Sequence, residues 1–328
     1  MSGVAILCPL CQLALDRQPR TWQCASGHSF DVAREGYVNL LPVQHKNSLE
    51  PGDDPQMVAA RREFLQAGHY RPLLDAVLET LAPLSLQSLL DVGCGEGSYT
   101  GALDAVAAQV IGLDIAKPAI RLAARRFPGP TWIVGSGTQI PLGSGAIDAV
   151  CNLFTQLHVG ELARVLKPEG HLLVVTPAAD HLWSLRERLF DEVRAHDPDK
   201  FLAALEGAFE LRSRREIRFG LELAQPGLRQ LLQMTPYAWK ARPERRAALE
   251  ASEMFETQAS FTLMLFRRRA DNAVDAPPEV EAAAAEVALP ETPAGAPGPT
   301  EIPESPEPPA TAEDSDPWKR ARKRRNGQ

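Results

Sequence analysis

Apolar and polar residues alternate along the middle of the chain with two different periods. Short apolar runs have the length of buried β-strands and occupy residues 88–92, 110–114, 131–134, 147–154 and 171–176. Residues 117–127 and 158–166 lie between such runs and have helical spacing, and Pro168 stops the second of them. This alternation of strand and helix predicts an open, mostly parallel sheet with helices on both faces.

The second half of the chain adds three further elements. Residues 181–209 have the pattern of a helix, and residues 210–219 and 260–266 alternate like antiparallel strands at the edge of a sheet. With the five apolar runs, these two strands make seven. The pattern therefore predicts a doubly wound α/β fold around a seven-stranded sheet.

The first apolar run ends in a glycine-rich turn with the sequence Asp-Val-Gly-Cys-Gly-Glu-Gly at residues 91–97. Glycine lets the backbone leave a strand sharply and approach a ligand where a Cβ would clash. Asp114 ends the second run, about 20 residues later, where an acidic side chain meets ribose hydroxyls. A dinucleotide-binding turn has a different glycine spacing, and Glu96 would repel a pyrophosphate but not a sulfonium cation.

These residues predict a class I (Rossmann-like) methyltransferase domain that binds S-adenosyl-L-methionine. The predicted cofactor-binding residues of the turn and of the second strand are Asp91, Gly93, Gly95, Glu96, Gly97 and Asp114. Together they place one adenosine between two strand ends.

A second cluster of chemistry-bearing residues lies near the N-terminus. Cys8 and Cys11 are followed, after 12 residues, by Cys24 and His28. This spacing is typical of a closed tetrahedral site in which four protein ligands hold a structural Zn²⁺. The alternatives are a disulfide or unmodified thiols.

Cysteine usage and the absence of targeting signals bear on this choice. The sequence contains five cysteines, and we find neither a signal peptide nor an apolar segment long enough to span a bilayer. We therefore expect a cytoplasmic protein with no membrane partner, in which thiols stay reduced. The clustered ligands then favour zinc.

The acidity of the chain is concentrated in its last 58 residues. From residue 271 onward there are 12 acidic and 6 basic residues, which leaves 30 acidic and 29 basic residues for positions 1–270. Residues 271–317 are rich in Pro, Ala and Glu and lack aromatic residues, so we expect them to be disordered. Residues 318–325 form a basic cluster that could grip RNA phosphates or could simply be solvated.

These features divide the sequence into four parts. We predict a zinc-binding module at residues 1–35, a connecting segment with a helix at the cofactor cleft at 36–80, the methyltransferase domain at 81–270 and the tail at 271–328.

Several motifs occur in the order found in one known family. They are the Cys/Cys/Cys/His set, EGYVNLLPVQHK at 35–46, RREFLQAGHY at 61–70, LDVGCGEG at 90–97 and QMTPYAW at 233–239. On these motifs, residues 6–267 resemble the 23S rRNA (guanine-N1)-methyltransferases. The resemblance implies an N-terminal zinc module joined to a class I methyltransferase domain.

The resemblance also implies an activity and its partners. The expected reaction is methyl transfer from S-adenosyl-L-methionine to N1 of a guanine in a domain II hairpin of 23S rRNA, near the peptide exit tunnel. The expected partners are 23S rRNA or a large-subunit precursor, and a second copy in a homodimer. Tyr70, Gly95, Glu96 and His181 match cofactor-contacting positions, and the ligand set Cys8, Cys11, Cys24 and His28 matches the family's zinc ligands.

The catalytic group is not identified by the sequence. Guanine N1 carries a proton near neutral pH, so some group must accept it or polarise O6. Asp180, His181 and His158 are the candidates, although Asp180 could equally cap a helix and His158 could begin one.

The chain departs from the family pattern after the fourth apolar run. Residues 152–156 read Asn-Leu-Phe-Thr-Gln, where the family pattern has an Ala-Pro or Ser-Pro step that lines the substrate pocket. Phe154, Trp183, Tyr237 and Trp239 are the rings available to stack on a base. A basic stripe through Arg17, Arg20, Arg34, Lys46, Arg61 and Arg62 is a further hypothesis for gripping RNA.

Two other functions compete with this interpretation. A small-molecule methyltransferase of the menaquinone or ubiquinone type shares the glycine turn and the segment at residues 162–168, but needs no zinc module. A zinc-dependent RNA-binding assembly factor is the third candidate, and the intact glycines and Asp114 argue against it.

Overall fold

The computed structural model describes residues 3–42 and 52–270 of the chain. Part of the connecting segment, including Lys46, and the whole tail with its basic cluster lie outside the described residues. The described part holds two sheets, one small and one large.

The small sheet lies at the N-terminus and is antiparallel. It consists of β1 (Leu15–Arg17), β2 (Thr21–Cys24) and β3 (Ser29–Asp31). Of the four potential metal ligands, Cys8 and Cys11 lie in the loop before β1, Cys24 ends β2, and His28 lies in the turn between β2 and β3.

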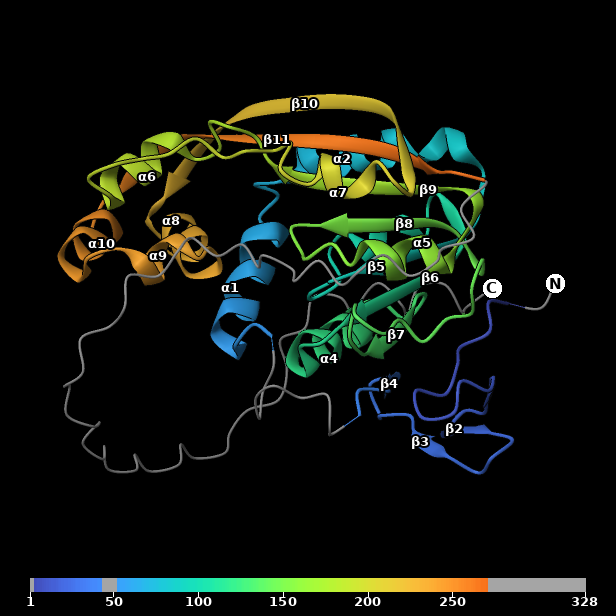
Figure 1. Ribbon diagram of the computed structural model, residues 1–328. Helices are drawn as coiled ribbons and strands as arrows, with labels where there is room; N and C mark the ends of the chain where they lie inside the picture. The colour runs from blue at the N-terminus through green and yellow to red at the C-terminus, as the bar shows by residue number, and fades with distance from the viewer. Residues whose placement is uncertain (1–2, 43–51, 271–328) are drawn as a thin grey trace, which may run out of the picture. The chain divides into compact units, whose positions relative to one another are not determined.

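The large sheet has eight strands in a mixed arrangement (Figure 1). In spatial order they are β10 (Phe209–Ala224), β11 (Met254–Arg268), β9 (Leu166–Pro177), β8 (Ile147–Leu153), β5 (Leu86–Val92), β6 (Ala107–Asp114), β7 (Thr131–Val134) and β4 (Tyr37–Asn39). Neighbours from β9 through β8, β5, β6 and β7 to β4 are parallel, and β11 pairs antiparallel with both β9 and β10.

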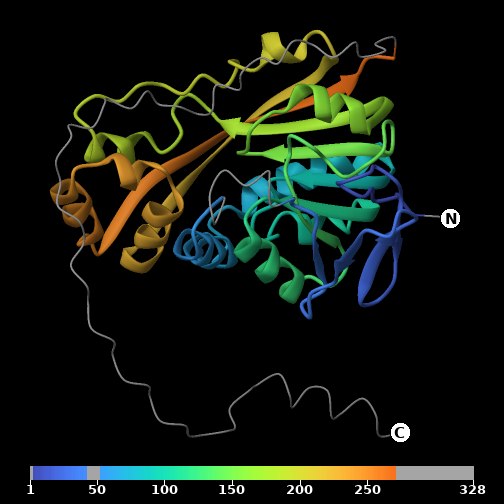
Figure 2. The ribbon, with the colours of Figure 1, turned by 60° about the horizontal axis from the view of Figure 1, so that its bottom comes forward.

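The helices of the described part connect or flank these strands. They are α1 (Pro55–Gln66), α2 (Arg71–Leu81), α3 (Thr100–Leu103), α4 (Lys117–Arg126), α5 (Val159–Val165), α6 (Trp183–Leu189), α7 (Leu202–Leu205), α8 (Gln225–Met234), α9 (Tyr237–Lys240) and α10 (Pro243–Glu250), with a 3₁₀ turn at Ala82–Leu84. Helices α6, α8, α9 and α10 gather around one end of the long strands β10 and β11 (Figures 1 and 2).

Local sequence explains why the helices begin and end where they do. Asp54 caps α1 by accepting hydrogen bonds from the amides of Gln56 and Met57 at 2.7 and 2.9 Å, and Pro55 occupies the first turn, where no amide is needed. Helix α4 buries Ile120 and Ala123 and ends with two arginines in its last turn, where cations interact favourably with the helix dipole.

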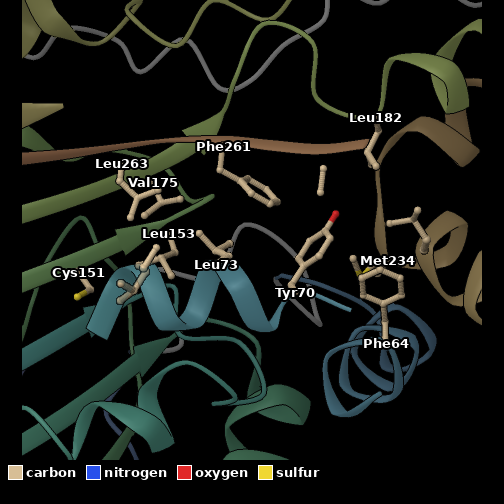
Figure 3. Close-up of a cluster of buried hydrophobic side chains, with 14 of the residues drawn as sticks. Phe64, Tyr70, Leu73, Cys151, Leu153, Val175, Leu182, Met234, Phe261 and Leu263 are labelled. Atoms are coloured by element: carbon tan, nitrogen blue, oxygen red, sulfur yellow. The ribbon is translucent and has the colours of Figure 1, made fainter. Parts of the chain in front are cut away.

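Alternating strand residues feed two apolar clusters on opposite faces of the sheet. Leu89 and Val110 belong to the cluster that includes residues of α1, α2 and α8, whereas Leu90 and Ile111 belong to the cluster that includes residues of the small sheet. Figure 3 shows part of the first cluster, in which Phe261 of β11 points toward Tyr70 at the start of α2. The central strands are therefore covered on both faces, as the parallel pattern predicted.

The predicted α/β fold is confirmed, with two differences in detail. The seven predicted strands all form, and β4 from the connecting segment adds an eighth next to β7. The predicted helix over 181–209 is wrong, because only α6 and α7 are helical there. Phe190 is extended at the end of α6, and Pro198 disfavours helical backbone in the residue before it.

Close packing between β6 and Trp132 generates a test of the fold. A Cβ added at Gly112 would lie 2.5 Å from Trp132 Cζ3 and 3.2 Å from Cys94 Sγ, so either the buried indole or the strand must move. We expect Gly112→Ala to lower the free energy of unfolding by about 1–3 kcal/mol in denaturant titrations. Gly220→Ala in β10 is the matched control, because nothing lies within 4 Å of its added Cβ. Equal stability of the two variants would contradict this packing.

Candidate functional site: a four-ligand cluster and a glycine turn lined by acids

The four predicted metal ligands converge in space. One ligand atom from each of Cys8, Cys11, Cys24 and His28 lies within 4.8 Å of all the others. Cys24 Sγ lies 3.4 Å from His28 Nδ1, Cys8 Sγ lies 3.6 Å from the same nitrogen, and the sulfurs of Cys11 and Cys24 are 3.5 Å apart. A tetrahedral Zn²⁺ with bonds of about 2.0–2.3 Å has ligand separations of roughly 3.5–3.8 Å, so these residues fit the ion.

Two turns hold the ligands in this arrangement. The amide of Gln12 donates to the Cys8 carbonyl at 2.9 Å, which closes the first turn around Cys11. The amide of Gly27 donates to the Cys24 carbonyl at 2.9 Å, and Gly27 has φ +84°, a conformation that glycine adopts without strain. The C-x2-C and C-x3-H spacings therefore place all four ligand atoms around a single position that one metal ion could occupy.

The small sheet is joined to the larger sheet by backbone and apolar contacts. Ile6 forms an antiparallel bridge with Leu142, and the amide of Leu7 donates to the Pro141 carbonyl at 2.8 Å. Ile6 and Cys8 are fully buried. The metal-ligand cluster therefore shares a hydrophobic core with the methyltransferase sheet.

The glycine turn lies at the carboxyl end of β5, between two close neighbours. Gly93, Gly95 and Gly97 have φ values of +72°, +56° and +82°. An added Cβ at Gly93 would lie 2.6 Å from Thr155 Cβ, and one at Gly97 would lie 2.6 Å from Trp132 Cη2. Both conformation and space therefore require glycine here, whereas Gly95 faces a more open region.

Three carboxylates surround this turn. Asp114 accepts hydrogen bonds from the amides of Gly95 and Ala116, at 2.8 and 2.7 Å. Asp91 accepts a hydrogen bond from Thr100 Oγ1 at 2.6 Å, yet burial raises the pKa of Asp91 to about 7. Glu96 is 3% exposed, and its Oε1 has no hydrogen-bond partner among the described residues. A buried acceptor without a partner fits a cationic ligand at the turn.

Arg61 is a residue of this site that the sequence did not assign to it. The guanidinium Nη1 of Arg61 lies 3.8 Å from a Cβ built at Gly95 and forms an ion pair with Asp53. Arg61 therefore faces the turn from α1, and its place in an RNA-binding stripe stays a hypothesis. Arg61 and Gly95 are far apart in the sequence and meet only in the folded protein. No local sequence pattern could therefore have revealed this contact.

Tyr70 and His181 lie together in an aromatic cluster. The Tyr70 ring is 5.1 Å from that of Phe261 and 6.4 Å from that of His181 (Figure 3 shows the first pair). The amide of Ser260 donates to His181 Nδ1 at 3.2 Å, and burial lowers the pKa of His181 to about 3. His181 is therefore neutral and, with Nδ1 accepting, carries its proton on Nε2.

The other two catalytic candidates occupy separate positions. Asp180 Oδ2 accepts a hydrogen bond from Gln258 at 3.1 Å, and Asp180 Oδ1 is buried without a hydrogen-bond partner in the described part of the chain. His158 precedes α5, and its ring lies 3.0 Å from a Cβ built at Gly137; burial lowers its pKa. Asp180 and His181 are thus adjacent after β9, whereas His158 lies beside the loop after β7.

A hollow elsewhere on the protein lies at the opposite edge of the sheet. Ser85, Leu86 and Ala107 are among its lining residues, at the amino ends of β5 and β6. Cofactors of open α/β folds bind at the carboxyl ends of the strands, so this hollow is not the cofactor site.

None of the helices described here is long and apolar enough to cross a membrane.

The metal-ligand cluster generates a direct test. Cys24→Ser removes one thiolate, so we expect the purified variant to lose its zinc and its melting temperature to fall by about 10 °C or more. Elemental analysis and thermal unfolding measure the two effects. Cys151→Ala is the control, because Cys151 is buried in β8 away from the cluster and should keep one zinc per chain. Retention of zinc by the Cys24 variant would contradict the assignment.

Comparison with known proteins covers both parts of the chain. A family model described as "RlmA, N-terminal" matches residues 6–49, and one described as "Methyltransferase domain" matches residues 90–174. A demethylmenaquinone methyltransferase of Tropheryma whipplei is 32% identical, but over only 34% of this chain and 49% of its own length. This match therefore covers about a third of the chain.

Longer matches extend over nearly the whole length of the relatives. A 23S rRNA (guanine(748)-N(1))-methyltransferase of Streptomyces fradiae is 34% identical over 79% of this chain and 95% of its own length. A candidate 23S rRNA (guanine-N(1)-)-methyltransferase of Micromonospora griseorubida is 36% identical over 79% of this chain and 96% of its own length. The four-ligand cluster, the glycine turn and these full-length matches agree: the chain is a zinc-containing, S-adenosyl-L-methionine-dependent enzyme that belongs to the 23S rRNA (guanine-N1)-methyltransferase family.

Proposed function

We propose that this protein transfers a methyl group from S-adenosyl-L-methionine to N1 of a guanine in 23S rRNA. One observation carries the proposal: a single chain holds the four-ligand cluster and the glycine turn, in the order and over the length of relatives that are named for this reaction. A guanine in the domain II hairpin near the peptide exit tunnel is the target that the family resemblance implies.

We assign the cofactor to the turn at the carboxyl end of β5. Asp114 would hold the ribose hydroxyls, and the glycines would let the backbone approach the ligand. Asp91 and Glu96 would face its cationic groups, since both carboxyls are buried and Glu96 Oε1 has no partner within residues 3–42 and 52–270. Tyr70 and His181 would close the site from α2 and from the loop after β9. The zinc ligands would be Cys8, Cys11, Cys24 and His28, in a structural role.

The residues of the chain divide the chemical work between positioning and proton transfer. The bound cofactor supplies an electrophilic methyl group, and holding the acceptor nitrogen in line with it provides much of the rate. His181 acts as a hydrogen-bond donor through Nε2, because its Nδ1 accepts from Ser260. Asp180 is then the candidate that accepts the N1 proton, through its Oδ1.

The partners and location follow from the proposed substrate. We propose that the enzyme acts in the cytoplasm on 23S rRNA or on a large-subunit precursor. A homodimer that cradles the RNA is the assembly that the family resemblance implies.

The raised pKa of Asp91 predicts a pH-dependent affinity for the cofactor. A raised pKa keeps the carboxyl protonated below about pH 7, and only the ionised form attracts an ammonium or sulfonium group. We expect the affinity for S-adenosyl-L-methionine to rise about tenfold between pH 6 and 7.5, in proportion to the ionised fraction. Calorimetric titration at several pH values measures this rise. Asp91→Asn should bind weakly and with a flat pH profile, and a flat profile for the wild-type protein would contradict the assignment.

The proposed reaction is tested by identifying the methylated nucleoside. Wild-type protein is incubated with isotopically labelled S-adenosyl-L-methionine and unmodified large-subunit rRNA, and the RNA is digested and analysed by mass spectrometry. We expect labelled 1-methylguanosine in the domain II hairpin, and none with Asp114→Ala, which cannot hold the ribose. Label on an extracted small molecule, with none on RNA, would replace the proposal with the quinone-type alternative.

A further inference from the structure

The loop that follows β8 lies against the glycine turn. It begins at Phe154, at the carboxyl end of the strand next to β5. Thr155 is the neighbour that leaves no room for a Cβ at Gly93. Phe154 precedes Thr155 and is 47% exposed. An aromatic ring is thus presented to solvent directly beside the predicted cofactor site.

The backbone of Phe154 is strained. Its φ is +59°, in the left-handed region that a bulky side chain rarely adopts. The surrounding structure fixes this conformation: the Phe154 amide donates to the Val175 carbonyl at 3.1 Å, and the buried Asn152 side chain donates to the Gln156 carbonyl at 3.1 Å. Strain that neighbouring contacts impose is typical of functional positions.

Comparison with the other strained residues singles out Phe154. Five non-glycine residues of the described part have positive φ, and only Phe154 and Leu182 are large and apolar. Both follow the carboxyl ends of neighbouring strands, β8 and β9. Leu182 is fully buried, so core packing accounts for it. The exposed half of the Phe154 ring has no such explanation.

The Phe154 ring has one packed side and one open side. Its centroid lies 5.4 Å from the ring of Phe261, at an interplanar angle of 55°. Phe261 in turn packs on Tyr70 and His181, with ring separations of 5.1 and 4.6 Å. One aromatic residue therefore separates Phe154 from the residues predicted to contact the cofactor, and Phe261 supports the ring from behind.

The other candidate stacking rings are already engaged. The guanidinium of Arg186 lies 5.4 Å from the centre of the Trp183 ring and 5.9 Å from that of the Tyr237 ring, so a cation already faces each of them. Trp239 is 55% exposed, but the guanidinium of Arg246 lies 5.6 Å from its ring. Among the four rings that the sequence offered, Phe154 is the one that combines an exposed ring, a strained backbone and a place beside the glycine turn.

We propose that Phe154 is the surface on which the target guanine stacks after it leaves its helix. The proposal rests on the proposed function. The N1 edge of guanine is hidden by base pairing, so the base must be turned out, and an aromatic face holds an unstacked base without regard to its hydrogen-bonding edge. The ring lies in the segment where the chain departs from the family pattern, and stacking on its face leaves N1 and O6 of the base free for Asp180 and His181.

The test compares Phe154→Leu with Phe154→Tyr in the full-length enzyme. Leucine keeps an apolar side chain but has no aromatic face, whereas tyrosine keeps the ring. With a domain II hairpin transcript as substrate, we expect kcat/KM for 1-methylguanosine formation to fall about 10- to 100-fold in Phe154→Leu and by less than about threefold in Phe154→Tyr. The dissociation constant for S-adenosyl-L-methionine should stay within about twofold of wild type in both variants. Leu211→Ala, which changes an exposed apolar residue of β10, should match the wild type.

A spectroscopic readout separates stacking from a general loss of activity. The target guanine is replaced by 2-aminopurine, which fluoresces when it is unstacked, and S-adenosylhomocysteine takes the place of the cofactor. The wild-type and Phe154→Tyr complexes should be quenched, and the Phe154→Leu complex should be several times brighter. Equal quenching in Phe154→Leu, together with kcat/KM within about twofold of wild type, would overturn this inference and leave the proposed function intact. Absence of 1-methylguanosine with the wild-type enzyme would overturn both.

Discussion

Three carboxyl groups gathered at the ends of two neighbouring parallel strands are the constraint on which this structure depends. Asp91 is buried near the end of β5, Glu96 lies buried within the glycine turn, and Asp114 holds that turn by accepting a hydrogen bond from the Gly95 amide. Burying negative charge costs free energy unless a cation or a set of hydrogen bonds compensates for it. Arg61, already paired with Asp53, is the cation that approaches from α1. In the proposed function, a positively charged cofactor would compensate for the buried charge of these acids.

The sequence predicted those parts of the site that depend on local spacing. The metal ligands could be found because their spacing is that of two short turns around one ion. The glycine turn could be found because Gly93, Gly95 and Gly97 all have positive φ. Contacts between distant segments left no such signal. The approach of Arg61 to Gly95 and the pairing of β4 with β7 depend on the packed fold, and β4 is too short to show a period. The helix predicted over 181–209 failed because tertiary contacts and Pro198 outweighed helix propensity.

The residues proposed for cofactor binding and those proposed for the target base lie at the ends of different strands. The ends of β5 and β6 carry the acids and glycines that suit a cofactor, whereas the ends of β8 and β9 carry Phe154, Asp180 and His181, which suit a base and its proton. Thr155 joins the two halves, because it packs into the space that Gly93 leaves open. A shift of the loop after β8 would therefore be transmitted to the glycine turn, which in the proposed function would keep the methyl donor and the acceptor aligned.

The bridge between Ile6 and Leu142 also governs the order in which this chain can fold. The small sheet with its four metal ligands is synthesised before the large sheet. It can bind its metal at once, because its ligands span a short stretch of sequence. Its apolar face has no partner until Pro141 and Leu142 have been synthesised, and β4 likewise waits for β7. Such distant pairings slow the last stage of folding, since the entropy of closing a long loop must be overcome before the contacts form. A small sheet that has bound its metal early would thus expose apolar surface during synthesis, and this surface would be covered only when the large sheet is complete.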